Sequence, residues 1–70
     1  MAKIEVSMAG NLWKLLKKQG DQVETGEEVA ILESMKMEIP IESVAGGQVK
    51  MVLKGEGDFV DEGETILEIE

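Results

Sequence analysis

The sequence predicts an all-β domain, a small barrel or sandwich made of two matching halves. Shifted by 37 positions, the chain aligns with itself without a gap, and eleven of the 33 aligned pairs are identical. Six of the eight glycines lie in these matched pairs, and they divide the chain into short pieces. Several of the pieces alternate apolar and polar residues with the period of a β-strand. Many short strands between turn residues favour a closed β architecture over a helical bundle.

The repeat predicts internal two-fold symmetry, with halves of about residues 1–33 and 38–70 in one domain spanning 1–70. Its strongest segment aligns GDQVETGEEVAIL with GDFVDEGETILEI. Two units are too few for a solenoid, which needs three or more repeats to bury a continuous core. Two halves that bury one face against each other fit the pattern better. The repeated glycines predict turns with positive φ, or sites of close backbone approach.

The strands are predicted in chain order from these patterns. Residues 3–6 (KIEV) alternate, whereas Asn11–Lys18 (NLWKLLKK) has leucines at spacings that also suit a helix. The partner segment from Gly47 (GQVKMVLKG) alternates Val49, Met51 and Leu53 with lysines, so both segments are predicted as strands. Residues 64–70 (ETILEIE) form the last predicted strand.

The middle of the chain predicts a tight hairpin with Lys36 at its tip. Glu28–Ser34 and Met37–Ser43 are predicted strands, which leaves about two residues for the connection. Pro40 would break a central strand, so the second strand is expected at a sheet edge or at a bulge. Positions 37 residues either side of Lys36 fall just beyond the chain ends. We therefore expect Lys36 to project from the end of the domain opposite the termini.

Composition excludes several classes of function. The 70-residue chain has no Cys and no His, which removes disulfides, thiol chemistry and catalytic units of the Ser-His-Asp or Cys-His kind. Its net charge of −8 disfavours nucleic acid and anionic membranes as partners. No apolar stretch reaches the roughly 20 residues of a membrane helix, and Glu5 interrupts any signal-peptide core. A cytoplasmic location and a monomeric state are expected, and the acidic clusters GEEV and DEGE are predicted to be solvated turns rather than metal sites.

An exposed lysine at a hairpin tip is usually an inert turn residue. It is almost wholly protonated at neutral pH, so it is a poor nucleophile unless burial or nearby cations activate it. It is a good acceptor for an enzyme that supplies both the activated acyl group and the base. Its central position, between Met35 and Met37, favours such an acceptor role for Lys36, and the domain itself is expected to be non-catalytic.

The segment ESMKME, from Glu33 to Glu38, resembles the biotinyl/lipoyl domain family, and in particular its biotin-accepting branch. MAGNLWK before it and GDFVDEG after it extend the resemblance over essentially the whole chain. The resemblance implies a flattened barrel of two four-stranded antiparallel sheets, with Lys36 as the residue to which a biotin protein ligase attaches biotin. It also implies that biotin carries CO₂ from a biotin carboxylase site to a carboxyltransferase site of a biotin-dependent carboxylase.

By the same resemblance, Met35 and Met37 help to present the lysine, and Glu33 is a candidate for partner discrimination. The glycines at 10, 20, 26, 46, 47, 57 and 63 would be structural turn residues. The chain resembles stand-alone bacterial biotin/lipoyl attachment proteins, or a carrier domain of a larger carboxylase. Two alternatives remain open, a lipoyl carrier and an unmodified assembly domain. The lipoyl branch typically has Asp and Ala where this chain has Met35 and Met37.

Overall fold

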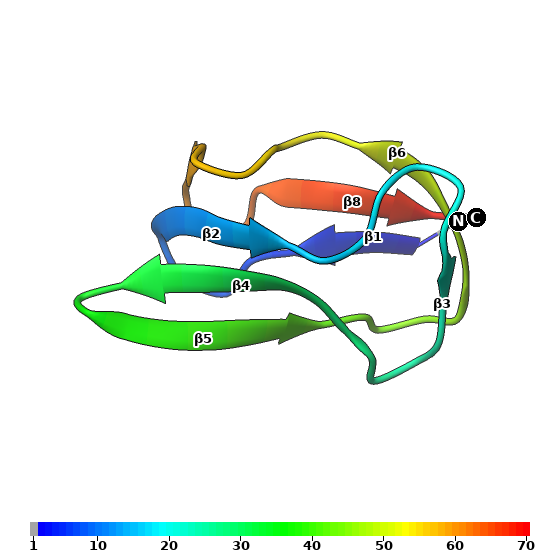
Figure 1. The fold of residues 1–70 in the computed structure, drawn as a ribbon, viewed down its shortest axis with the longest axis horizontal. Coiled ribbons are helices and arrows are strands. Elements are labelled where there is room, and N and C mark those ends of the chain that lie inside the picture. Colours follow the sequence, from blue (N-terminus) through cyan, green and yellow to red (C-terminus); the bar gives the residue numbers. More distant parts are fainter. Residues whose placement is uncertain (1) are drawn as a thin grey trace.

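The computed structural model describes residues 2–70, which fold into eight β-strands arranged as a flattened barrel (Figure 1). The strands are β1 (Ala2–Glu5), β2 (Gly10–Leu15), β3 (Gln22–Val23), β4 (Glu28–Ser34), β5 (Met37–Glu42), β6 (Gly47–Val52), β7 (Phe59–Val60) and β8 (Thr65–Ile69). They form two four-stranded antiparallel sheets, in the orders β1-β8-β6-β3 and β5-β4-β2-β7. The all-β prediction is confirmed, and no helix in the described part of the chain is long and apolar enough to cross a membrane.

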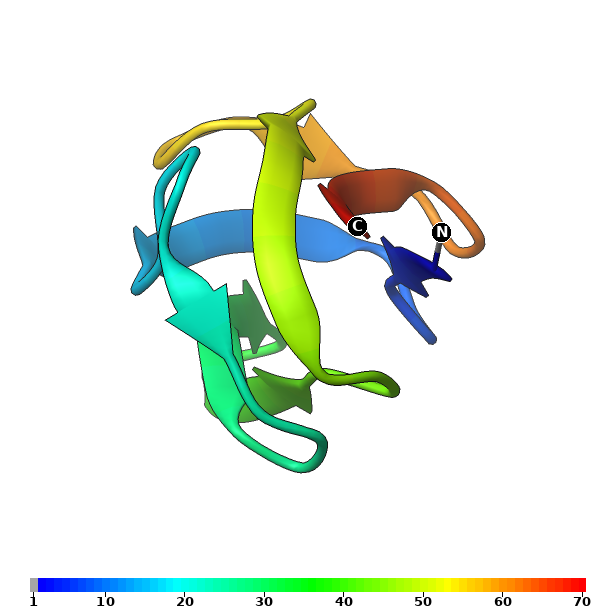
Figure 2. The same ribbon diagram turned by 90° about the vertical axis from the view of Figure 1, so that its right-hand side faces the viewer.

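The 37-residue repeat is visible in the strands themselves. Adding 37 to the bounds of β2 and β3 gives the bounds of β6 and β7. Each sheet is therefore the counterpart of the other, strand for strand. The bulges also correspond, since β2 is bulged between Leu12 and Lys14 and β6 between Val49 and Met51. The two sheets enclose the core between them (Figure 2).

The core obeys the same symmetry. Six pairs of residues related by the repeat are all buried: Ile4 and Ile41, Leu12 and Val49, Val23 and Val60, Val29 and Ile66, Ala30 and Leu67, Leu32 and Ile69. The remaining buried apolar residue is Val6, whose counterpart is Ser43, the buried polar residue among those described. The Ser43 hydroxyl is satisfied because it hydrogen-bonds the backbone of Ala45. Each half thus supplies one side of a shared core.

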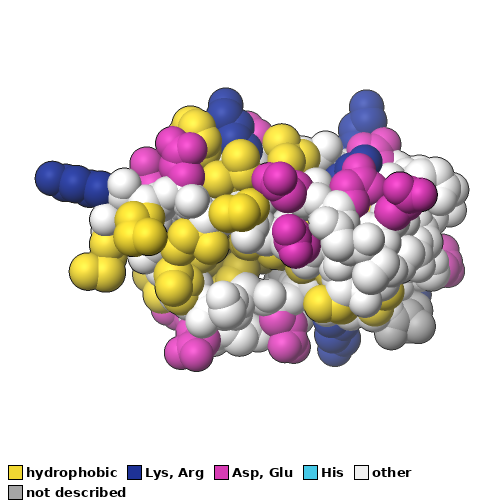
Figure 3. All heavy atoms as spheres, turned by 90° about the horizontal axis from the view of Figure 1, so that it is seen from below, with side chains coloured by type: hydrophobic (Ala, Val, Ile, Leu, Met, Phe, Trp, Pro, Cys, Tyr) yellow, Lys and Arg dark blue, Asp and Glu magenta, His cyan; other side chains and the backbone are white. Residues whose placement is uncertain are grey.

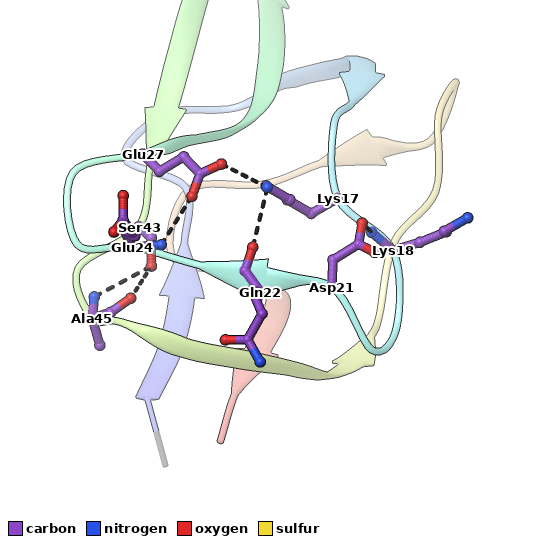
Figure 4. A network of polar contacts seen from close by, with 8 residues as sticks. All are labelled: Lys17, Lys18, Asp21, Gln22, Glu24, Glu27, Ser43 and Ala45. Carbon is purple, nitrogen blue, oxygen red and sulfur yellow. Dashed lines mark hydrogen bonds and ion pairs between the residues drawn. The ribbon is translucent and has the colours of Figure 1, made fainter.

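Acidic side chains hold the turns that lead into the strands. The N–H of Lys18 donates to the Asp21 carboxylate at 3.0 Å, and the N–H of Glu24 donates to the Glu27 carboxylate at 2.9 Å (Figure 4). The second half repeats both bonds, from Gly55 to Asp58 at 2.8 Å and from Asp61 to Glu64 at 2.7 Å. An Asp or Glu that accepts from the N–H three residues before it closes the turn, as the N3 Glu of a helix capping box does. The acidic clusters are therefore turn-forming residues.

One ion pair in each half ties such a turn to the neighbouring loop. Lys17 Nζ lies 2.6 Å from the Glu27 carboxylate, and Lys54 Nζ lies 3.3 Å from that of Glu64. The hydrogen bond from Lys17, then that from the N–H of Glu24, lowers the pKa of Glu27 below its ordinary 4.5. The N–H of Asp61, followed by Lys54, lowers the pKa of Glu64 in the same way. Both carboxylates are still partly accessible to water, so each pair adds little stability.

Two details of the sequence-based expectation are wrong. Gly10 and its counterpart Gly47 are not turn residues but the first residues of β2 and β6, where a Cβ would meet the carbonyl oxygens of Glu33 and Glu70 respectively. Both are sites of close backbone approach, while Gly20, Gly26, Gly57 and Gly63 have the positive φ of true turns. Met51 and Leu53 do not share the inward face with Val49, because the bulge in β6 shifts the alternation and leaves both exposed.

Candidate functional site

The β4–β5 hairpin forms one end of the barrel, and its turn is Met35 and Lys36. Ser34 pairs with Met37 to close the hairpin, so the connection has two residues, as predicted. Met35 has φ 51° and Lys36 has φ 65°. Two successive residues with positive φ define a type I′ turn, whose twist matches that of the flanking strands. This turn normally uses Asn or Gly, so two bulky residues here are conformationally strained.

The strain is not balanced by packing at the tip. Met35 is 91% exposed and Met37 is 62% exposed, and Lys36 is exposed between them. Lys17 and Lys54 form ion pairs, whereas within residues 2–70 the ammonium of Lys36 has neither an ion pair nor a hydrogen bond. Hydrophobic side chains also gather over this half of the surface in the view from below (Figure 3). The tip therefore presents a free amine flanked by two thioethers, in a conformation that folding alone does not favour.

Lys36 lies at one end of the long axis of the molecule. The barrel measures 31 × 19 × 18 Å, and the hairpin tip and the chain ends lie at opposite ends of the longest dimension (Figure 1). Ala2 pairs with Ile69, so the first and last strands meet at the far end. The expected separation of the lysine from the termini is confirmed. A chain joined to either terminus would leave the tip accessible.

Two carboxylates face each other at the base of the tip. Glu33 of β4 is paired directly with Glu38 of β5, and both side chains are exposed. Like charges on directly opposed residues destabilise a sheet slightly. The sequence analysis singled out Glu33 but not its pairing with Glu38. A two-residue turn between 34 and 37 places 38 opposite 33, so the hairpin register alone could have found it.

Lys36 lies apart from the other candidate features of the described residues. Among the described residues, no group of three or more acidic side chains could hold a metal ion. A surface depression of about 560 Å³ is lined by residues including Leu15, Lys18 and Glu56. Leu15 is opposite Ala30 in β4, toward the end of the sheet away from the tip. An accessible lysine amine of this kind can be modified by another enzyme.

The chain as a whole has counterparts among known proteins. The Biotin_lipoyl family, described as "Biotin-requiring enzyme", matches residues 2–69. The chain belongs to the biotin/lipoyl attachment family. It is 62% identical over 66 residues to the biotin/lipoyl attachment protein of Bacillus subtilis, covering 94% of this chain and 90% of that protein. Biotin/lipoyl attachment domains are carriers of a bound group and are not themselves catalysts.

Larger members of the biotin/lipoyl family contain the same domain as a small part. The structure of urea carboxylase from Kluyveromyces lactis superimposes with a TM-score of 0.89 at 32% identity, covering 97% of this chain and 6% of that one. The dihydrolipoyllysine-residue acetyltransferase component of pyruvate dehydrogenase from Pseudomonas aeruginosa is 41% identical over 61 residues, covering 87% of this chain and 11% of that protein. The fold expected from the sequence is therefore confirmed, and biotin and lipoyl proteins both occur among the relatives.

Proposed function

We propose that Lys36 is the site of covalent biotin attachment and that the chain is a biotin carboxyl carrier. The observation that supports this most strongly is the strained two-residue turn, which holds an unpaired lysine beyond the barrel with an exposed methionine on each side. Folding stability gives no reason for Met-Lys at two positions of positive φ. Recognition of this tip by a modifying enzyme would explain why these two residues are present.

The attachment step needs only an accessible amine from this chain. A biotin protein ligase supplies biotinyl-adenylate, and the deprotonated Nζ of Lys36 attacks its carbonyl carbon. The new C–N amide bond forms as the C–O bond to the phosphate breaks, and AMP leaves with that electron pair. The ammonium loses one proton to become the nucleophile, and the nitrogen loses a second as the amide forms and keeps the third as the amide N–H. We assign both released protons to a base of the ligase, because no described side chain binds Nζ. The hairpin holds the backbone of Lys36 at the end of the barrel, so the ligase can reach its side chain without crossing the rest of the domain.

Residues around Lys36 have roles that fit this proposal. The side chains of Met35 and Met37 are flexible and polarisable, and such residues adapt to a partner surface. Glu33 and Glu38 form a like-charge pair beside the tip, at some cost to the sheet. We assign Glu33 a role in discriminating between partners, through its charge at the base of the hairpin. No residue of this chain is assigned a catalytic role.

Attached biotin provides the carboxylation chemistry, in which CO₂ is carried between a biotin carboxylase site and a carboxyltransferase site. The chain's own contribution is to hold Lys36 at the end opposite the termini, so that a tether or docked terminus does not obstruct the arm. The likeness to a urea carboxylase structure supports carboxylase components as partners. The proposal places a monomeric carrier with its ligase in the cytoplasm.

Intact mass measurement tests the proposal directly. The chain is co-expressed with a biotin protein ligase, and the Lys36→Ala variant is treated identically. We expect one biotinyl group per chain on the wild type, located at Lys36 by peptide mapping, and none on the variant. A biotinyl group on Lys36→Ala, or an unmodified wild type, would refute the assignment.

A lipoyl carrier is the second candidate, favoured by the 41% identity to the acetyltransferase component. Met35 and Met37 argue against it, since the lipoyl branch typically has Asp and Ala there. A parallel expression with a lipoate ligase and lipoic acid decides between the two. Lipoylation without biotinylation supports this second candidate, and no adduct with either ligase supports an assembly domain.

A further inference from the structure

The sheet that carries the hairpin has an outer face rich in apolar side chains. Residues paired across neighbouring strands point to the same side of a sheet. The pairings give one outer row of Phe59, Asn11, Glu33 and Glu38, and a second row of Lys14, Ile31 and Pro40. Trp13 lies in the β2 bulge between the rows and is 42% exposed, and Phe59 is 56% exposed. We call Trp13, Ile31, Pro40 and Phe59 the apolar face.

The other sheet provides an internal control for this surface. The residues 37 positions away from Phe59, Trp13, Ile31 and Pro40 are Gln22, Lys50, Glu68 and Lys3 respectively. Those four polar residues occupy the equivalent outer positions, in strands with the same pairing and the same bulge. The same architecture therefore folds with polar side chains at every one of these positions. The apolar face has a reason other than folding, and exposed apolar patches commonly mark protein contacts.

We infer that the apolar face, together with its surrounding carboxylates, is the docking surface for the biotin protein ligase. This inference rests on the proposed function, since it requires that a ligase act on Lys36. The surface is continuous with the hairpin, because Glu38 lies two residues after Lys36 and Pro40 two further along the same strand. At about 3.3 Å per residue, the two rows lie about 7 and 13 Å from the tip. Both distances are within the span of a standard interface of about 800 Å² per partner.

The charges around the apolar face select the kind of partner. Glu33 pairs with Glu38 and Glu28 pairs with Glu42, so both ends of the hairpin present paired carboxylates. The cation in these rows, Lys14, lies 5.3 Å from the centroid of the Trp13 ring. A second copy of this chain would bring like charges together, in a protein with a net charge of −8. An enzyme that binds an acyl-adenylate needs cationic side chains around the phosphate. The positive charge at its active-site entrance is therefore complementary to the carboxylates around the apolar face.

The reach of the lysine favours the ligase over the carboxylase components. An extended lysine side chain places Nζ about 6 Å from its Cα. The reacting carbon must come within about 3–3.5 Å of Nζ, so the ligase has to approach the bare hairpin closely. After modification the arm is longer, and a carboxylase site can be reached without contact between the protein surfaces near the tip. A surface that begins on the hairpin strands therefore suits the enzyme that acts first.

Steady-state biotinylation kinetics test this inference. The double variant Trp13→Lys with Phe59→Gln installs the residues that the symmetric positions already carry. The control Gln22→Lys adds an equal positive charge to the opposite sheet. With a purified bacterial biotin protein ligase and saturating biotin and ATP, we expect the KM for the double variant to rise about 10- to 100-fold. We expect its kcat to stay within about twofold of the wild type, and the KM of the control to change less than about twofold, since neither change touches Lys36.

Binding without chemistry gives an independent readout. Lys36→Ala should inhibit biotinylation of the wild type competitively, and the triple variant with Trp13→Lys and Phe59→Gln should lose that inhibition. Circular dichroism and Tm establish that each variant is folded, and Phe59→Gln alone replaces the double variant if that does not fold. A wild type modified at Lys36 with a KM unchanged by these substitutions overturns the docking surface while leaving the proposed function intact. If the ligase KM is unchanged but the substitutions abolish self-association or function with a carboxylase, the apolar face belongs to that other partner.

Discussion

The strained turn at the lysine leads to a prediction about stability. Met35 adopts φ 51° and is 91% exposed, so its side chain contributes almost nothing to packing. Replacing it with Asn keeps the chain length and the hairpin register but supplies a residue that favours this conformation. Met35→Asn should therefore stabilise the domain, although it changes the residue next to Lys36.

The size of the effect follows from conformational preference. Asn is several-fold enriched over other non-glycine residues in the left-handed region. A fourfold preference corresponds to RT ln 4, or about 0.8 kcal/mol at 25 °C, which is below the full penalty of about 1–2 kcal/mol for an L-residue there. For a domain of this size, such a gain raises Tm by about 4 °C.

Thermal and urea unfolding followed by circular dichroism measure the change. Met37→Asn is the matched control, because Met37 begins β5 and is not among the residues with positive φ. Asn is disfavoured in strands, so the control should lose up to about 0.5 kcal/mol. If Met35→Asn is no more stable than the wild type, the turn is not strained and our account of the tip is wrong. A more stable variant that is biotinylated more slowly would show that the methionine is kept for recognition.

Three other predictions concern the barrel. Gly10→Ala should lower the free energy of unfolding in urea by about 2–3 kcal/mol, since its Cβ would lie 2.6 Å from the backbone oxygen of Glu33. Gly20→Ala, at φ 94° in open space, should lower it by only about 1 kcal/mol. Equal losses for the two variants would contradict this distinction. Leu12→Ala should cost about 2–5 kcal/mol because Leu12 is fully buried, and Leu16→Ala, at 48% exposure, should cost less than about 0.5 kcal/mol. Glu27→Gln should lower Tm at neutral pH. Because the pKa of Glu27 is lowered in the folded state, the difference in Tm between variant and wild type should persist above pH 4.5 and vanish as the pH falls below 4.5. A Tm difference that grows in acid would contradict this reasoning.

Much of the fold could be predicted because the sequence contains it twice. Asn11–Lys18 suits a helix when taken alone, because Leu12 and Leu15 are three residues apart. The β2 bulge explains that spacing, since its extra residue returns Leu15, rather than Lys14, toward the core. The partner segment from Gly47 has apolar residues alternating with lysines, which indicates a strand. Because the two segments are related by the repeat, the strand predicted for one is also expected for the other. The end of β2 at Leu15 was not predicted, because it depends on the turn that Asp21 caps.

Other features depend on contacts that no local pattern reveals. The strands β3 and β7 have two residues each, too few for alternation, so neither was predicted from the sequence pattern. The position of Lys36 at the tip could be predicted, but the positive φ of both turn residues could not, because Met and Lys are not residues that favour it. The apolar face was missed because a single exposed Trp13 or Phe59 is not informative alone. It becomes informative only when compared with the polar residue at the symmetric position of the other sheet.

The two-fold arrangement has a consequence for the end of the barrel that holds the termini. Ala2 and Ile69 are paired as Ile39 and Leu32 are in the hairpin sheet, so the chain ends occupy the place of a missing turn. Closing that gap with a short Met-Lys turn would produce a circular polypeptide with a second lysine at the opposite end of the 31 Å long axis. Opening such a ring at the original hairpin would exchange the roles of the two ends, with the β-scaffold unchanged.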